Sequence, residues 1–80
     1  MKEEIKDKID GMVKGTKVML FMKGTPSFPQ CGFSARTVAI LNEIGADFES
    51  FDVLEDEDVR QGIKEYGSWP TIPQLYVHHE

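Results

Sequence analysis

Residues 18–22 read Val-Met-Leu-Phe-Met, an uninterrupted apolar run in an 80-residue chain. A strand with one face in water alternates apolar and polar residues, whereas a continuous short run is typical of a strand buried on both faces. Residues 23–30 then carry one glycine and two prolines. The sequence therefore predicts a doubly covered strand followed by an irregular loop.

Three segments have the apolar spacing of helices. The first contains Ile5, Ile9, Met12 and Val13 and ends within residues 11–15. The second covers residues 32–44, and Gly45 supplies its C-terminal stop. The third follows Asp56 as its N-cap, has acidic residues in its first turn and stops at Gly67.

Two further strands complete the expected elements. Residues 48–53 are rich in aromatic and β-branched side chains, and residues 74–77 form a short third strand. Residues 69–73 hold too much proline for either regular element. A helix joins the first two strands, so we expect these strands to be parallel in one α/β sheet, with residues 1–80 forming a single domain.

Composition excludes several classes of protein. Nine basic and fourteen acidic residues give a net charge of −5, the wrong sign for binding nucleic acid. No apolar run is long enough to span a membrane, and no targeting segment is visible. A single cysteine excludes an internal disulfide and a metal site built on cysteine pairs. We therefore expect a reducing compartment, either the cytoplasm or an organelle interior after removal of a leader.

Cys31 is the strongest candidate for chemistry. It lies where the proline-bounded loop meets the helix beginning near Gly32, and free backbone N–H groups there favour a thiolate. Lys23, at the other end of the loop, can add positive charge and lower the thiol pKa further. The alternative is that Cys31 is a buried apolar residue, but Gln30 and Gly32 beside it are not typical of a core.

Ser34 stands three residues after Cys31, where a two-thiol oxidoreductase keeps its second cysteine. A hydroxyl cannot form a disulfide, so a cycle between two thiols of this chain is excluded. Two alternatives remain for Cys31: a mixed disulfide with an external thiol, or ligation of a metal centre. A [2Fe–2S] cluster normally needs four thiolates, and one chain supplies only one.

Four segments together resemble the monothiol, CGFS-type glutaredoxins: residues 23–26, residues 29–34 with CGFS at 31–34, residues 60–66 and residues 69–74. The resemblance implies a thioredoxin-like fold with a central mixed sheet flanked by helices. Members of this family continue past this point into a further strand, a Gly-Gly-x-Asp segment and a last helix. We therefore expect a C-terminally truncated domain. His78 and His79 are poor metal ligands, because neighbours on a strand point to opposite faces.

The resemblance also implies site residues. Cys31 would be the nucleophile and the cluster ligand, and Lys23 and Arg60 would bind the glycyl carboxylate of glutathione. The Ile72–Pro73 bond would be cis, exposing the backbone N–H and C=O of Ile72 to glutathione. Two alternatives stay open: Arg60 pairs with Asp56 or Glu57 at helical spacing, and residues 69–73 form only a rigid loop.

The implied cofactors are glutathione and a [2Fe–2S] cluster, the latter held by two protomers and two glutathiones. We favour a carrier that forms a homodimer when cluster-bound and passes the cluster to apo iron–sulfur proteins. The second hypothesis is a glutathione-dependent thiol–disulfide oxidoreductase acting through a Cys31 mixed disulfide. The third is a partner-binding module whose open sheet edge is completed by another chain.

Overall fold

The structure, a computed structural model, describes residues 1–77, and the prediction for His78 and His79 lies outside them. Three α-helices, three strands and one 3₁₀ turn follow one another in these residues. They are α1 (Glu3–Lys14), β1 (Val18–Met22), α2 (Gly32–Glu43), β2 (Glu49–Asp52), η1 (Val53–Glu55), α3 (Glu57–Tyr66) and β3 (Gln74–Val77). The predicted order of helices and strands is confirmed.

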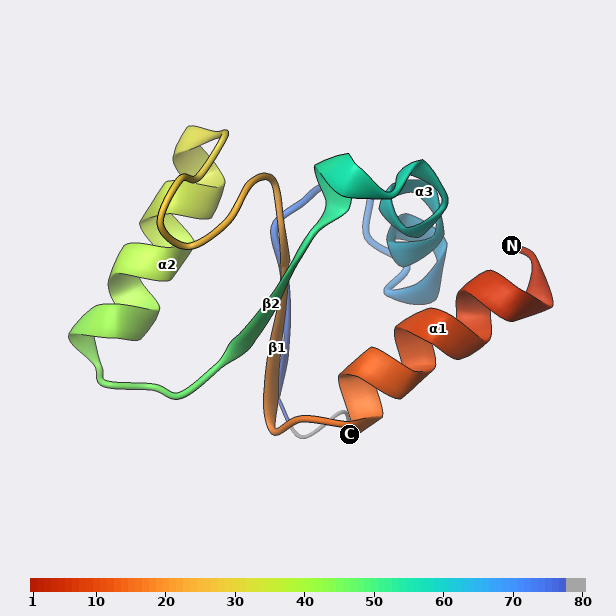
Figure 1. The fold of residues 1–80 in the computed structure, drawn as a ribbon, viewed down its shortest axis with the longest axis horizontal. Helices are drawn as coiled ribbons and strands as arrows, with labels where there is room; N and C mark the ends of the chain where they lie inside the picture. The colour runs from red at the N-terminus through yellow and green to blue at the C-terminus, as the bar shows by residue number, and fades with distance from the viewer. Residues whose placement is uncertain (78–80) are drawn as a thin grey trace.

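The sheet has the order β2-β1-β3, with β1 in the centre. β1 and β2 are parallel, as the crossover helix between them predicts, whereas β3 runs antiparallel to β1. Helix α2 covers one face of the sheet, and α1 and α3 lie together on the other (Figure 1). The expected mixed sheet flanked by helices is therefore present.

The two faces of β1 enter two separate cores. Met19 and Phe21 pack with α1 and α3, while Leu20 and Met22 pack with α2. All four side chains are buried. This alternation explains the continuous apolar run, because neither face of β1 reaches water.

Polar contacts join α1 to α3 on the side away from α2. The Tyr66 hydroxyl donates to Asp10 Oδ1 at 2.7 Å, and Lys8 Nζ pairs with Asp56 Oδ2 at 2.7 Å. Asp56 also caps α3 by accepting from the Val59 N–H, as predicted. In the described part of the chain, no helix has the length and apolar character needed to cross a membrane.

Element ends differ slightly from the sequence-based expectation. The second strand was expected over residues 48–53 but runs over Glu49–Asp52, and Val53 begins a 3₁₀ turn. The cause is Asp52, whose carboxylate accepts a hydrogen bond from the Leu54 N–H at 2.9 Å and turns the backbone. This turn brings the end of β2 close to the loop that follows β1.

Candidate functional site around Cys31

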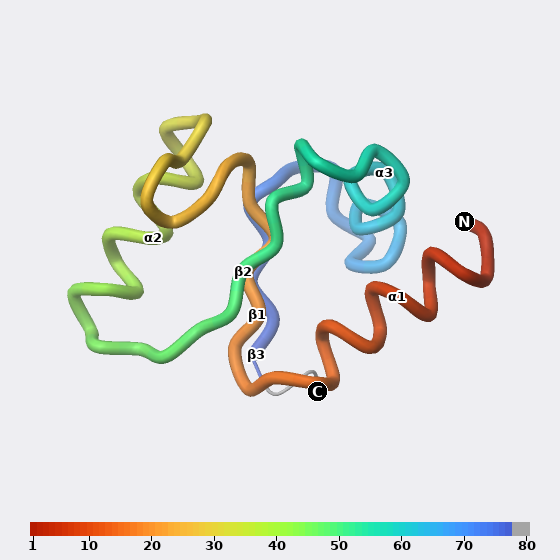
Figure 2. The backbone as a smooth tube through the Cα atoms, in the orientation of Figure 1, coloured from red at the N-terminus to blue at the C-terminus, as the bar shows by residue number. Residues whose placement is uncertain are grey.

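Three irregular segments meet at one end of the sheet (Figure 2). Met22 at the end of β1 lies beside Asp52 at the end of the parallel β2, and Phe21 lies beside Gln74 at the start of the antiparallel β3. The loop after β1, the turn after β2 and the loop before β3 therefore converge. Sheet topology alone places them together.

Cys31 is the N-cap of α2. Its backbone is extended, with φ −151° and ψ 154°, and its Sγ accepts a hydrogen bond from the Ser34 N–H at 3.3 Å. The Ser34 Oγ lies 3.2 Å from the same sulfur. The thiol is partly exposed. The alternative of a buried apolar cysteine is therefore wrong, since the side chain acts as a helix cap.

Ser34 links Cys31 to the loop after β1. Its side chain is fully buried, and its Oγ accepts a hydrogen bond from the Lys23 N–H at 3.1 Å. When the Cys31 thiol loses its proton, the Ser34 hydroxyl can donate to the sulfur while still accepting from Lys23. One buried hydroxyl thus connects the backbone of Lys23 to the Cys31 sulfur.

The loop after β1 is also held by Asp52. The Gly24 N–H donates to Asp52 Oδ1 at 2.9 Å, and Gly24 has a φ of +89°. A Cβ at Gly24 would lie 2.5 Å from the Phe28 carbonyl oxygen. Only glycine fits this close turn at positive φ. The end of β2 therefore fixes the backbone next to Lys23.

The surroundings of Cys31 favour its thiolate form. Partial burial alone would raise the pKa of Cys31, but hydrogen bonds from the Ser34 hydroxyl and from the backbone N–H groups of Ser34 and Phe33, together with the charge of Lys23, outweigh it. The pKa therefore lies below its ordinary value, as the sequence predicts. A thiolate is the form that attacks disulfides and binds metals.

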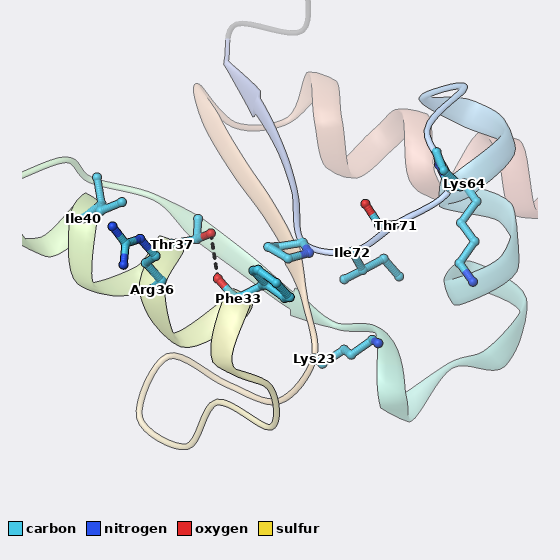
Figure 3. Close-up of a pocket in the computed structure, with 10 residues that line it drawn as sticks. Lys23, Phe33, Arg36, Thr37, Ile40, Lys64, Thr71 and Ile72 are labelled. Atoms are coloured by element: carbon cyan, nitrogen blue, oxygen red, sulfur yellow. Dashed lines mark hydrogen bonds between the residues drawn. The ribbon is translucent and has the colours of Figure 1, made fainter.

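A cavity of about 550 Å³ lies between α2 and the loop before β3. Its wall is formed by α2, by the two basic residues Lys23 and Lys64, and by residues 70–73. The α2 side chains are Phe33, Arg36, Thr37 and Ile40. Figure 3 shows Phe33 and Thr37 on the α2 side, with Lys23, Lys64 and Ile72 across from them. The size is that of a site for a small molecule.

The predicted site residues are only partly brought together. Lys23 and Ile72 line the cavity, and Cys31 lies between Lys23 and Phe33 in the chain and caps the helix that forms one wall. The Ile72–Pro73 bond is cis, as the resemblance implies. Arg60 does not line the cavity; its Nη1 pairs with Glu57 Oε1 at 3.3 Å.

Two further basic residues line the cavity, and the sequence did not single them out. Arg36 lies on α2 and Lys64 on α3. A lone basic residue on a helix is usually a solvated charge. The available signal for Lys64 is its spacing, because it stands four residues after Arg60 and hence on the same side of α3.

Among residues 1–77, no group of three or more His, Cys, Asp or Glu side chains could hold a metal ion. Cys31 therefore stands alone as a thiolate donor in this part of the chain.

Comparisons with known proteins show the family of the chain. The Glutaredoxin family model matches residues 18–80. A protein of Synechocystis sp. described as an uncharacterized monothiol glutaredoxin ycf64-like is 59% identical over 80 residues, covering 100% of this chain and 75% of that protein. Monothiol glutaredoxin-5, mitochondrial, of Saccharomyces cerevisiae is 51% identical over 96% of this chain, which spans 53% of its length.

A solved structure shows the same fold. The solution structure of reduced poplar apo GrxS14 matches with a TM-score of 0.79 and 56% identity, covering 95% of this chain and 70% of that one. The three-stranded mixed sheet with its helices is thus a thioredoxin-like glutaredoxin fold. The chain belongs to the glutaredoxin family and is similar to monothiol members of it.

Proposed function

We propose that this chain carries a [2Fe–2S] cluster as cargo and passes it to apo iron–sulfur proteins. Two protomers would each supply the Cys31 thiolate, and two glutathiones would supply the remaining two sulfur ligands. The cluster-bound form would be a homodimer. The supporting observation is a lone, partly exposed thiol with a lowered pKa, with Ser34 in place of a second thiol beside it.

The cavity supports glutathione as the molecule that completes the ligand set. Glutathione is an extended peptide with two carboxylates, and the cavity offers the side chains of Lys23, Arg36 and Lys64 in a chain of net charge −5. We propose that Lys23 binds a carboxylate of glutathione and that the backbone N–H and C=O of Ile72 pair with its peptide groups. The glutathione sulfur would then lie near Cys31.

Arg60 is kept as a second carboxylate ligand in this proposal. Within residues 1–77 its Nε is buried without a hydrogen-bond partner, and a buried donor gains from a ligand or water that accepts from it. Its present partner, Glu57, is exposed, so the pair contributes little and exchange for a glutathione carboxylate would cost little.

The second candidate function is glutathione-dependent thiol–disulfide exchange. The lowered pKa of Cys31 favours it, because the thiolate could attack the glutathione sulfur of a mixed disulfide and release the substrate thiol. A second glutathione would then attack the Cys31 mixed disulfide, releasing oxidised glutathione and restoring the thiolate. No second thiol of this chain would take part.

Anaerobic reconstitution with iron and sulfide, with and without glutathione, tests the proposal. We expect visible cluster absorbance only when glutathione is present, and none in Cys31→Ser, which keeps the size of the side chain but lacks the thiolate. Ser27→Ala, a change at an exposed loop position, serves as the control and should keep the absorbance.

Two outcomes would oppose the proposal. Absorbance that persists in Cys31→Ser would place the cluster elsewhere. A colourless protein that rapidly reduces a glutathione mixed disulfide would make exchange, not cluster carriage, the function of Cys31.

A further inference from the structure

Gln74 is buried beside the cavity wall. In the described part of the chain, the buried polar side chains are Ser34 and Gln74, and Gln74 is 8% exposed. Ser34 contacts Cys31, whereas Gln74 lies at the start of β3, next to the loop of residues 69–73. A buried amide needs several hydrogen bonds, so its partners indicate what it holds in place.

Both polar atoms of the Gln74 side chain form hydrogen bonds. Its Nε2 donates to the Trp69 carbonyl at 3.0 Å and to the Thr71 carbonyl at 3.2 Å, and its Oε1 accepts from the Tyr76 hydroxyl at 2.6 Å. Burial raises the pKa of Tyr76, so this hydroxyl keeps its proton at neutral pH. The carbonyls of Trp69 and Thr71 set the orientation of the amide, because a flipped amide would point its oxygen at both of them, and the Tyr76 hydroxyl then donates to Oε1.

Gly67 has no side chain, which leaves space for the hydrogen-bonded side chains of Gln74 and Tyr76. A Cβ at Gly67 would meet the Tyr76 hydroxyl and would lie 2.6 Å from Gln74 Oε1. The Tyr76 ring stands edge-on to Tyr66, with ring centroids 5.8 Å apart. Position 67 must therefore be small, and the two bonded side chains fill the space next to it.

The loop of residues 69–73 has few other internal restraints. The Trp69 N–H donates to the Lys64 carbonyl at 3.0 Å, but within residues 1–77 no backbone–backbone bond outside the regular elements involves Thr71 or Ile72. The same loop forms one wall of the cavity, from Pro70 to Pro73. The buried Ile72 side chain anchors the loop in the core, and the Gln74 amide supplies the hydrogen bonds that hold the carbonyls of Trp69 and Thr71 to the start of β3.

We infer that Gln74 is a positioning residue of the cavity: it fixes the carbonyls of Trp69 and Thr71 and thereby presents the Ile72 backbone to a bound peptide. This inference rests on the proposed binding of glutathione at Ile72. Gln74 does not line the cavity itself. Its effect passes through the loop, and the Tyr76 hydroxyl supplies the hydrogen bond to the other end of its amide.

Calorimetric titration of the 80-residue chain with reduced glutathione tests this role. Gln74→Leu keeps the size of the side chain but removes two donors, so we expect affinity to fall by about tenfold or more. Tyr76→Phe keeps the ring and loses only the hydroxyl that donates to Gln74 Oε1, so we expect a smaller loss. Gln61→Leu makes the same substitution at an exposed position of α3 and should leave the affinity unchanged.

Two readouts separate positioning from general damage to the fold. Trp69 is the sole tryptophan, so its fluorescence anisotropy decay reports on the loop; a faster component should grow in Gln74→Leu and not in Gln61→Leu. The pH profile of Cys31 alkylation should stay unchanged in all three variants, because Ser34 and not Gln74 contacts the sulfur.

The outcomes distinguish this inference from the proposed function. Unchanged glutathione affinity in both Gln74→Leu and Tyr76→Phe would overturn the role of Gln74 and leave glutathione binding intact. An alkylation profile that shifts in step with the affinity would also overturn it, since that indicates general loss of structure. An unsubstituted chain that binds no glutathione would overturn both.

Discussion

Among the side chains around Cys31, Ser34 contributes most to lowering the pKa of its thiol. The Ser34 N–H and Oγ both lie within hydrogen-bond reach of the Cys31 sulfur, and the side chain is fully buried. Ser34 also accepts from the Lys23 N–H. Ser34 stands where a two-thiol oxidoreductase has its second cysteine. In this structure its hydrogen bonds to the sulfur favour the thiolate form of Cys31.

Ser34→Ala should move the pH midpoint of Cys31 alkylation upward. The hydroxyl stabilises the charged form, so its loss raises the pKa of Cys31 and lowers the thiolate fraction at neutral pH. Rates of iodoacetamide alkylation measured against pH check this, with Ser27→Ala as the exposed control. A midpoint that stays in place or falls would contradict the assigned hydrogen bond.

The same substitution should lower stability. Without the Ser34 hydroxyl, the Lys23 N–H loses its partner in a partly buried position, which costs about 1–3 kcal/mol. Urea unfolding of Ser34→Ala and Ser27→Ala measures the difference. Equal midpoints in the two variants would mean that water replaces the lost partner without cost.

Lys23→Ala should weaken glutathione binding. Removing one charge-assisted hydrogen bond costs about 1.5–3 kcal/mol, which corresponds to a loss of about 10- to 150-fold in affinity. Lys17→Ala removes the same charge from an exposed position just before β1 and serves as the matched control. If calorimetry gives equal affinities for the two variants, Lys23 acts only through the overall charge.

At the scale of elements, the end of β2 holds the site together. Asp52 Oδ1 accepts from the Gly24 N–H and from the Leu54 N–H, each at 2.9 Å. One bond turns the chain out of β2, and the other holds the loop that carries Lys23. The Asp52 carboxylate therefore joins the loop after β1 to the turn after β2, at the end of the sheet where the loops converge.

Asp52→Ala should destabilise the fold by about 1–3 kcal/mol, because two backbone donors lose their acceptor. Asp52→Asn keeps an oxygen at the same position and should recover most of this loss. Denaturant midpoints of the two variants give the comparison. Should Asn prove as damaging as Ala, the negative charge of Asp52 matters rather than its role as an acceptor.

The elements could be predicted from the sequence, but the contacts among them could not. The run Val18–Met22 and the stops at Gly45 and Gly67 are local signals, and the structure follows them. The bonds of Asp52 to Gly24 and of Lys8 to Asp56 join positions far apart in the chain. No local pattern indicates such pairs, since they arise only when the sheet order is known.

The candidate site was predicted only in part, because local motifs indicate some of its residues and long-range packing places the others. Cys31 and Lys23 follow from the junction of loop and helix, and the cis bond at Ile72 follows from a motif and not from the dipeptide. Whether Arg60 pairs with Asp56 or Glu57 or binds a ligand was left open, because both acidic residues stand at helical spacing from it. Lys64 was missed, because its place in the cavity depends on how α3 packs.

At the scale of the whole molecule, the layers determine where a partner can approach Cys31. Helices α1 and α3 cover one face, and α2 alone covers the other (Figure 1). Phe28 and Phe33, on either side of Cys31 in the sequence, are 74% and 79% exposed. In the proposed cluster-bound homodimer, these exposed apolar side chains would be available for contact with a second protomer that approaches Cys31.

Native mass spectrometry of the reconstituted, coloured species tests the central claim most directly. The proposal predicts one dominant ion containing two chains, one [2Fe–2S] cluster and two glutathiones, and only apo monomer in Cys31→Ser. A cluster carried by a single chain, or by two chains without glutathione, would contradict the proposed ligand set.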